Sequence, residues 1–218
     1  MSAIERQANA SALESNYASE IDDALQFLKD CLSSASHPIA STKFSPDSAV
    51  FLHLLTSVCP KIPIIWVDTG YNTRDSIRYV EYLQSTLDLN LKTYRPANLN
   101  PPIAPELGTP AHDAFTYATK LEPFHQALKE LEPDLWLSSL RRYQSAHRST
   151  LAKQEAISSG LSKCYPMLDW SPAAVDAYRR VFNLPIGPDV YDPTKGLPLR
   201  ECGLHTKLWS AADSQVSR

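Results

Sequence analysis

Short apolar runs alternate with helical patterns along this chain. The clearest run is residues 62–68, IPIIWVD, which is β-branched, is too short for a helix, and ends at Asp68 before a turn. Further runs predict strands at 37–42, 89–94, 135–140 and 163–168. Helical patterns lie near residues 19–34, 46–58, 73–88, 121–131, 145–158 and 171–182. This alternation predicts an α/β fold in which a parallel twisted sheet is flanked by helices.

Two stretches, 96–110 and 183–200, interrupt the pattern because they are dense in proline and lack periodicity. Long irregular segments in compact domains are usually ordered loops near a site, or lids, so we expect one or the other here. The length of 218 residues suits one core. The predicted organisation is an N-terminal helical segment packed on the domain at 1–36, an α/β domain at 37–182 and a C-terminal tail at 183–218.

The net charge of -3 argues against broad attraction to nucleic acid or to a membrane surface. Any anionic ligand must therefore be held by local groups. The charged N-terminus has no apolar run of signal-peptide length, and no later run approaches a membrane span. We expect a soluble, cytoplasmic protein.

The four cysteines are Cys31, Cys59, Cys164 and Cys202, and they include no CxxC or adjacent pair that could hold zinc or an iron–sulfur cluster. In a reducing compartment they should be free thiols. The first three fall in or beside apolar patterns, where a thiol behaves as a small hydrophobic group. Cys202 differs because its segment is polar.

The segment STKFSPDS lies where a predicted strand passes into a helix. Among its polar side chains, the junction offers Ser41, Thr42, Lys43 and Ser45. Ser45 is predicted as the N-cap and Pro46 as the first helical residue. The N–H groups and the positive dipole of such a helix can hold phosphate or sulfate, with Lys43 adding charge. The alternative is a good helix cap and nothing more.

The segment VDTGY places an acid and a tight turn directly after the buried strand. Asp68 could accept a hydrogen bond from a ribose hydroxyl or an adenine amine, and Thr69 stands beside it. Gly70 would let the backbone approach a ligand closely. The alternative is an ordinary turn between a strand and a helix.

The segment SLRRYQSAHRST is basic and follows another predicted strand. Its basic side chains are Arg141, Arg142, His147 and Arg148. Arginine forks match the geometry of phosphate and sulfate. Positive charges near a helix N-terminus oppose its dipole, so a bound anion would offset their cost. A solvated, basic helix start is the alternative.

The segment LRECGLH surrounds Cys202 with Arg200 and Glu201, and His205 follows three positions later. The thiolate is the nucleophilic form of cysteine, and nearby positive charge lowers the thiol pKa. The alternative is a chance surface thiol. Ligands of open parallel sheets bind beyond the carboxyl ends of the strands, and all four segments fall at or near predicted strand ends.

Together, and in this order, these segments resemble the phosphoadenylyl-sulfate (PAPS) reductase family, the thioredoxin-dependent enzymes of sulfate assimilation. The resemblance runs from about residue 37 to about 208. ECGLH is its most specific motif, and IPIIWVDTGY, LNLKTYRP and LRRYQSAHR, of the form LRRxQSxxR, resemble further segments. KLEPFHQALKEL resembles a segment whose lysine contacts the substrate's phosphosulfate, which carries that role to Lys120.

The resemblance implies an adenine nucleotide α-hydrolase-like fold, related to ATP pyrophosphatases. It also implies that the Cys202 thiolate attacks the sulfur of the sulfonucleotide, and that reduced thioredoxin frees sulfite from the S-sulfocysteine. Glu201 and His205 would orient or poise the thiol. The implied substrate-binding residues outside the first two segments are Lys120, Arg141, Arg142, Gln144, Arg148 and Arg200.

Two segments depart from the family pattern. STKFSPDS stands where the family shows a sequence like SSSFGxQA, and residues 187–200 are a short substitute for a GD- and threonine-rich stretch. Relatives that use adenylyl sulfate bind a four-iron cluster through CC and CxxC cysteines, which this chain does not have. The resemblance therefore implies the 3'-phosphorylated substrate, no metal and no bound redox cofactor, with thioredoxin as partner and electron donor.

Two alternatives remain open. An ATP-using adenylyltransferase of the same superfamily would need an intact SGGKDS loop and magnesium, and would have no use for ECGLH. A catalytically altered or regulatory sulfonucleotide-binding relative would be compatible with the changed loop. The residues leave the oligomeric state open, a homodimer included.

Overall fold

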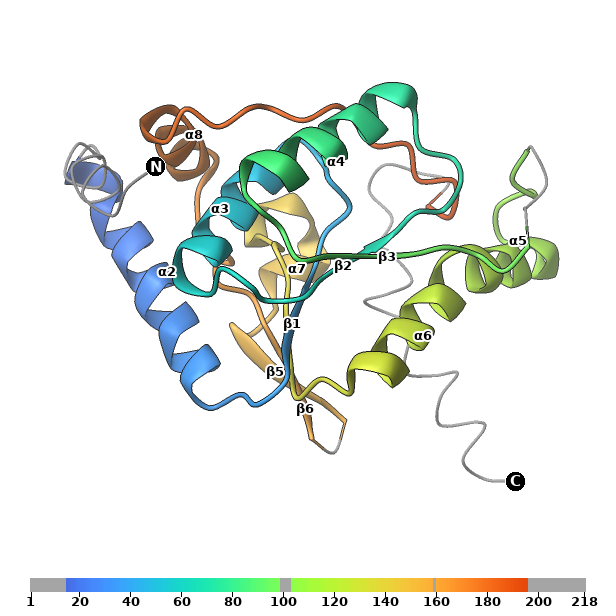
Figure 1. Ribbon diagram of the computed structural model, residues 1–218, viewed down its shortest axis with the longest axis horizontal. Helices are drawn as coiled ribbons and strands as arrows, with labels where there is room; N and C mark the ends of the chain where they lie inside the picture. Colours follow the sequence, from blue (N-terminus) through green and yellow to red (C-terminus); the bar gives the residue numbers. More distant parts are fainter. Residues whose placement is uncertain (1–14, 99–102, 159, 196–218) are drawn as a thin grey trace.

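A computed structural model describes residues 15–98, 103–158 and 160–195. Its centre is a six-stranded sheet in the order β3-β2-β1-β4-β6-β5 (Figure 1). The strands are β1 (Pro38–Ser41), β2 (Ile64–Val67), β3 (Leu91–Tyr94), β4 (Leu135–Leu137), β5 (Gln154–Ser158) and β6 (Leu161–Cys164). All neighbours pair in parallel except β5, which runs antiparallel to β6 at the edge. The predicted parallel α/β sheet is confirmed.

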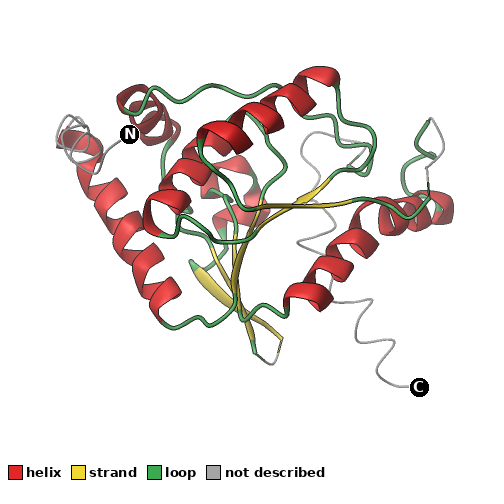
Figure 2. Cartoon of the chain, viewed as in Figure 1, coloured by secondary structure: helices red, strands yellow, loops and turns green. Residues whose placement is uncertain are grey.

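Helices cover both faces of the sheet (Figure 2). They are α2 (Ser15–Ser33), α3 (Ser48–Val58), α4 (Arg74–Thr86), α5 (Pro110–Thr116), α6 (Glu122–Leu131), α7 (Ala146–Ser149) and α8 (Pro172–Val181). A π-helix, η1 (Tyr117–Leu121), joins α5 to α6, and a short 3-10 helix, η2 (Arg142–Gln144), follows β4. α2, α3 and α8 pack against one another, and α6 packs against β2 and β3. No helix in the described part is long and apolar enough to cross a membrane.

Alternate residues of the central strands enter different hydrophobic clusters. Ala40 and Ile64 belong to the larger cluster, which α2, α3, α4 and α8 cover. Ile39 and Ile65 belong to the smaller cluster beneath α6. Successive side chains of a strand point to opposite faces, so a strand buried on both faces reads as a continuous apolar run. This is why residues 62–68 formed so clear a pattern.

The predicted helix over 145–158 is wrong. Only Ala146–Ser149 is helical, and Gln154–Ser158 forms the edge strand β5. Gly160, with φ +97°, lies in the tight turn between β5 and β6. The pairing of β5 with β6 outweighs the helix propensity of its Gln, Glu and Ala residues. α5 and η1 also lie where no helix was predicted.

α2 belongs to the core although it precedes the sheet. Its Ile21, Ala24 and Leu28 are almost fully buried in the larger cluster. The Nε1 of Trp170, just before α8, donates to the carbonyl of Glu20 at 3.1 Å. The division of the chain at residues 36 and 182 stays a prediction.

Candidate active site

The loop between β1 and α3 is tied together by hydroxyl groups. The Thr42 hydroxyl donates to Ser48 Oγ at 3.1 Å and accepts from the Phe44 N–H at 3.2 Å. Ser45 Oγ lies 3.3 Å from the same Ser48 oxygen. Phe44 has a left-handed backbone, φ 54°, and its buried ring packs edge-on against Trp66. The loop therefore keeps a defined shape without glycine.

The predicted start of α3 is wrong by two residues. The helix begins at Ser48 with Asp47 as the N-cap residue, not at Pro46 with Ser45 as the cap. The Ser48 N–H donates to the Ser45 carbonyl at 2.9 Å, which places Ser45 and Pro46 in a turn before the helix. The Asp47 side chain makes no capping hydrogen bond. Its carboxylate is used elsewhere.

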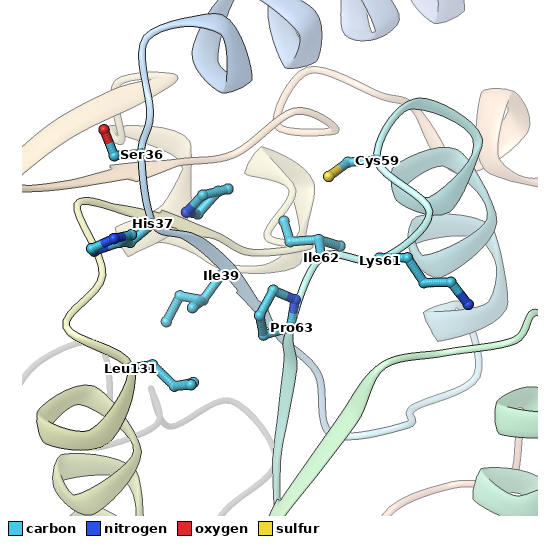
Figure 3. Close-up of a pocket in the computed structure, with 9 residues that line it drawn as sticks. Ser36, His37, Ile39, Cys59, Lys61, Ile62, Pro63 and Leu131 are labelled. Atoms are coloured by element: carbon cyan, nitrogen blue, oxygen red, sulfur yellow. The ribbon is translucent and has the colours of Figure 1, made fainter.

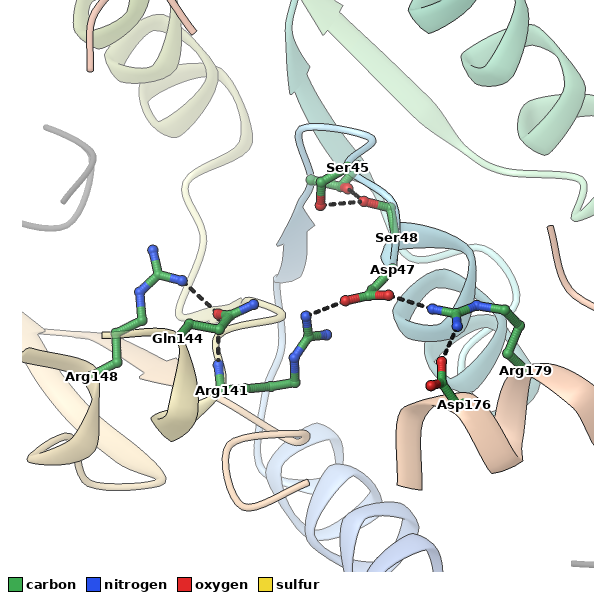
Figure 4. Close-up of polar contacts among 9 residues, drawn as sticks. Ser45, Asp47, Ser48, Arg141, Gln144, Arg148, Asp176 and Arg179 are labelled. Atoms are coloured by element: carbon green, nitrogen blue, oxygen red, sulfur yellow. Dashed lines mark hydrogen bonds and ion pairs between the residues drawn. The ribbon is translucent and has the colours of Figure 1, made fainter. Parts of the chain in front are cut away.

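The Asp47 carboxylate forms ion pairs with two arginines from different parts of the chain (Figure 4). Arg141 Nη2 lies 2.5 Å from Asp47 Oδ2, and Arg179 of α8 contacts the other oxygen. Arg141 is 4% exposed, and the buried Nε atoms of both arginines make no hydrogen bond within the described part of the chain. Two guanidinium groups and one carboxylate thus meet at the first turn of α3, which leaves a net positive charge where the helix dipole is also positive. Sequence reasoning missed Arg179.

Ser41 and Lys43 occupy different environments in this loop. Ser41 Oγ accepts a hydrogen bond of 2.8 Å from Nε1 of Trp136, which is fully buried in β4. The side chain of Lys43 is exposed. The structure thus uses the Ser41 hydroxyl to satisfy a buried donor of the neighbouring strand.

Gln144 organises the arginine segment after β4. Its Oε1 accepts from the Arg141 N–H at 3.1 Å and from Arg148 Nη1 at 2.5 Å. Arg142 makes different contacts, since its Nε donates to Asp169 Oδ1 at 2.6 Å and its Nη1 donates to the Leu151 carbonyl at 2.5 Å. One amide therefore holds the backbone of Arg141 and the guanidinium of Arg148, whereas Arg142 is bound to the loops around Asp169.

Asp68 stabilises the turn that follows β2. Its Oδ1 accepts from Asn72 Nδ2 at 2.7 Å and from the Gly70 N–H at 3.3 Å, and its Oδ2 accepts from Arg95 Nε at 2.9 Å. Gly70 has φ +82°, a conformation that L side chains rarely adopt. Thr69 Oγ1 accepts from the Tyr71 N–H at 3.4 Å. The predicted contact of this turn with a nucleoside stays a prediction.

Lys120 projects from the π-helix η1, a type of helix that is frequent at functional sites. Its Nζ lies 2.5 Å from Asp192 Oδ2, and both side chains are only 10% exposed. Burial alone would raise the pKa of the Asp192 carboxyl, but the charge and hydrogen bond of Lys120, with the hydrogen bonds from Thr194, hold it below its ordinary value. Sequence reasoning predicted Lys120 and missed Asp192.

Asp192 lies on a segment of irregular backbone, residues 183–195, which we call the strap. The strap follows α8 and runs past α4 (Figure 1). The Gly187 N–H donates to the Pro46 carbonyl at 3.0 Å, and a Cβ at Gly187 would lie 2.5 Å from the Tyr79 ring. The strap therefore touches the loop before α3 at one point and Lys120 at another.

The predicted residues Arg200, Glu201, Cys202 and His205 lie outside the described residues. Cys202 follows Lys195, the last described residue of the strap, by seven positions. Seven extended residues span at most about 24 Å, which limits the distance between Cys202 and the end of the strap.

A hollow of about 370 Å³ lies at the opposite end of the strands (Figure 3). Pro38 begins β1, Pro63 precedes β2 and Leu131 ends α6, so this hollow adjoins the amino ends of the sheet. Its lining is mostly apolar. It is therefore distinct from the polar edge that the segments after β1, β2 and β4 share.

Residues 37–192 match the phosphoadenosine phosphosulfate reductase domain family. The chain belongs to this family. The resemblance read from the motifs is thereby confirmed. The phosphoadenosine 5'-phosphosulfate reductase of Synechocystis sp. is 36% identical in an alignment 200 residues long, and the match covers 78% of this chain and 80% of that protein. The protein of the same name from Photobacterium profundum is 32% identical over 194 residues, with 76% of each chain covered.

Two solved structures show the same fold at low sequence identity. The phosphoadenylyl-sulfate reductase of Candida auris in a phosphate complex has a TM-score of 0.66 at 20% identity, with 88% of this chain and 96% of that chain covered. The FMN adenylyltransferase of Candida glabrata, in complex with FMN and an ATP analogue, has a TM-score of 0.59 at 14% identity, with 75% and 55% covered. The predicted adenine nucleotide α-hydrolase-like class is confirmed.

Proposed function

We propose that this chain reduces 3'-phosphoadenylyl sulfate to sulfite and adenosine 3',5'-bisphosphate in sulfate assimilation. The match of residues 37–192 to the reductase family carries the proposal, since the related proteins bear this activity in their names. The positive groups at the first turn of α3 support it, because the substrate is a polyanion.

In the proposed first step, the Cys202 thiolate forms a bond to the sulfur of the sulfonate. The bond between that sulfur and the bridging oxygen breaks, and its electron pair stays on the phosphate of the leaving adenosine 3',5'-bisphosphate. The product on the enzyme is an S-sulfocysteine. Glu201 and His205 would orient the thiol, and Arg200 would add positive charge near it.

In the proposed second step, reduced thioredoxin supplies the electrons. One of its thiolates attacks the Cys202 sulfur, so sulfite leaves and a mixed disulfide forms. The second thiol of thioredoxin then releases Cys202 as a thiol. The dithiol becomes a disulfide while the substrate sulfur gains two electrons, so the proposed reaction needs no bound redox cofactor or metal. The need for reduced thioredoxin is consistent with a cytoplasmic location of this chain.

The described residues would contribute binding and charge stabilisation, which are the main needs of a reaction with a phosphate leaving group. Gln144 holds the guanidinium of Arg148, and Asp47 holds that of Arg141, so less side-chain entropy is lost when these two arginines bind an anion. Lys120 and the N–H groups at the start of α3 would stabilise further negative charge. Arg142 would contribute indirectly, because its bond to Asp169 helps to fix the backbone of the arginine segment after β4.

The decisive experiment supplies 3'-phosphoadenylyl sulfate with reduced thioredoxin and measures sulfite. Sulfite from the wild type and none from Cys202→Ser is the expected result. Cys59→Ser is the matched control, because Cys59 is a free, partly buried thiol at the amino ends of the strands and should keep full activity.

Absence of sulfite from the wild type, or equal sulfite from Cys202→Ser, would contradict the proposal. The same protein should also be given ATP with sulfate, and pyrophosphate measured. Clear pyrophosphate release would favour the adenylyltransferase alternative, whereas tight binding of the sulfonucleotide without any turnover would favour the regulatory one.

A further inference from the structure

Two cysteines meet in the larger hydrophobic cluster. Cys31 lies near the end of α2, Cys164 is the last residue of β6, and the two are 133 positions apart. Their Sγ atoms are 3.3 Å from each other, within hydrogen-bonding distance. Both thiols are free and both residues are buried, with exposed fractions of 6% and 0%. The fold therefore brings two thiols from distant parts of the chain into direct contact.

The contact lies where an outer helix meets an inner strand. β6 is hydrogen-bonded to β4 on one side and to β5 on the other, so Cys164 is held within the sheet. α2 packs against α3 and α8, and it ends at Ser33, two positions after Cys31. Asp30 and Ser33, on either side of Cys31, are exposed, and helix ends open more readily than sheet interiors. A small oxidant in water therefore reaches Cys31 before it reaches Cys164.

The two thiols differ in acidity. The hydrogen bond from the Cys164 thiol lowers the pKa of Cys31 below its ordinary value, although burial opposes this effect. The same hydrogen bond, together with burial, raises the pKa of Cys164. Because the thiolate is the nucleophilic form, Cys31 is the reactive member of the pair. Cysteines buried in apolar surroundings are usually inert, and the contact with Cys164 distinguishes Cys31 from them.

We propose that Cys31 and Cys164 form a site of reversible oxidation, at which a hydroperoxide converts the two thiols to a disulfide that ties α2 to the sheet. This inference goes beyond the proposed function and needs neither the sulfonucleotide nor Cys202. A disulfide places its sulfurs about 2.05 Å apart, so the two atoms must approach by about 1.2 Å. That distance is shorter than one carbon–carbon bond, so α2 keeps its place on the sheet.

The oxidation takes two steps. In the first, the Cys31 thiolate attacks one oxygen of hydrogen peroxide, the O–O bond breaks, and the leaving hydroxide takes up a proton as water, so Cys31 becomes a sulfenic acid. In the second, the Cys164 sulfur bonds to the Cys31 sulfur, the S–O bond breaks, and the leaving hydroxide takes the Cys164 proton as water. The two thiols lose two electrons, and one peroxide becomes two waters. Reacting atoms about 3–3.5 Å apart are in near-attack geometry, so the second step should outpace further oxidation of Cys31.

The test treats the reduced, folded protein with hydrogen peroxide, unfolds it in an alkylating agent and digests it. Mass spectrometry should find a pair of peptides joined through Cys31 and Cys164, which dithiothreitol separates. Cys59→Ala is the matched control, because Cys59 is a third free thiol but lies at the amino ends of the strands, whereas Cys164 ends its strand. The control should form the same joined pair, and Cys31→Ala should form none.

A second measurement follows thermal unfolding. Oxidised wild type should have a Tm about 5–15 °C above that of the reduced protein, because the bond closes a loop of more than 100 residues in the unfolded chain. Cys31→Ala given the same peroxide should show no rise, which separates the disulfide from any other oxidation. If Cys31→Ala does not fold, Cys164→Ala replaces it, and the joined peptides of the wild type remain decisive without either variant.

Three results would overturn the inference. Cys31 and Cys164 that both remain open to alkylation after peroxide treatment would show that the contact does not lead to a bond. Sulfinic acid on Cys31 beside a free Cys164 thiol, or pairing of either residue with another cysteine, would show the same. Joined protein that is no more stable than the reduced form would show that the bond does not tie α2 to the sheet. None of these results depends on whether the chain forms sulfite.

Discussion

Asp47→Asn tests the convergence of two arginines on the first turn of α3. In the wild type, one carboxylate accepts from Arg141 and from Arg179, whose side chains are 5% and 11% exposed. An asparagine oxygen would keep one hydrogen bond without the charge, and its amide would point N–H groups toward the second guanidinium. The variant therefore leaves two buried cations without their shared counter-charge.

The magnitude follows from the two bonds. A hydrogen bond to a charged group contributes roughly 1 kcal/mol more than one to a neutral group. Removing the charge from both contacts should therefore lower the free energy of unfolding by about 2 kcal/mol. Complete loss of a buried partner costs about 3–5 kcal/mol, but the Asp47 side chain is 27% exposed and retains an oxygen, so the lower figure applies. For a chain of this length, about 2 kcal/mol corresponds to a fall in Tm of roughly 4–8 °C.

The assay is chemical unfolding followed by tryptophan fluorescence, with Asp176→Asn as the matched control. Asp176 also pairs with Arg179, but its side chain is 56% exposed, so its loss should cost less than about 0.5 kcal/mol. A double-mutant cycle of Asp47→Asn with Arg179→Gln should show coupling of about 0.5–3 kcal/mol. If Asp47→Asn is no less stable than Asp176→Asn, the charges are not held together as described, and the reasoning fails.

Three further predictions concern other contacts. Gly187→Ala should lower the free energy of unfolding by about 1–3 kcal/mol, because the added methyl meets a buried tyrosine ring; an unchanged midpoint in urea would contradict this. The pKa of Asp192 lies below its unfolded value, so the stability that it gains from Lys120 is present above about pH 4 and is lost as the pH falls through the lower, folded pKa. The difference in unfolding free energy between wild type and Asp192→Asn should therefore stay constant from about pH 8 to pH 5 and shrink in stronger acid; shrinkage already near pH 6 would contradict the lowered pKa. Ser41→Ala should cost about 1–3 kcal/mol by leaving Trp136 Nε1 buried without its acceptor, and Thr42→Ala provides a comparison in which no buried ring donor is lost.

The apolar runs were enough to predict the sheet because the central strands are buried on both faces. Residues 62–68 combine β-branched side chains with a following turn, and that local pattern specifies a strand. The edge strand β5 could not be predicted in this way, since its residues favour a helix and only pairing with β6 makes them extended. The start of α3 shifted for a similar reason, because Ser45 forms a turn with Ser48.

The residues of the candidate site also fall into two groups, those with a local signal in the sequence and those without one. Position after a predicted strand pointed to Arg141 and to the loop before α3, because residue type and position after a strand are local properties of the sequence, whereas Lys120 was predicted only from the family resemblance of its segment. Arg179 sits in the pattern of an ordinary amphipathic helix, and Asp192 sits in a proline-rich loop, so neither is distinguished by its neighbours in the chain. Their importance comes from partners 132 and 72 positions away. Only the packing of α8 against α3, and of the strap against η1, brings those charges together, since a buried ion pair exists only where tertiary structure excludes water.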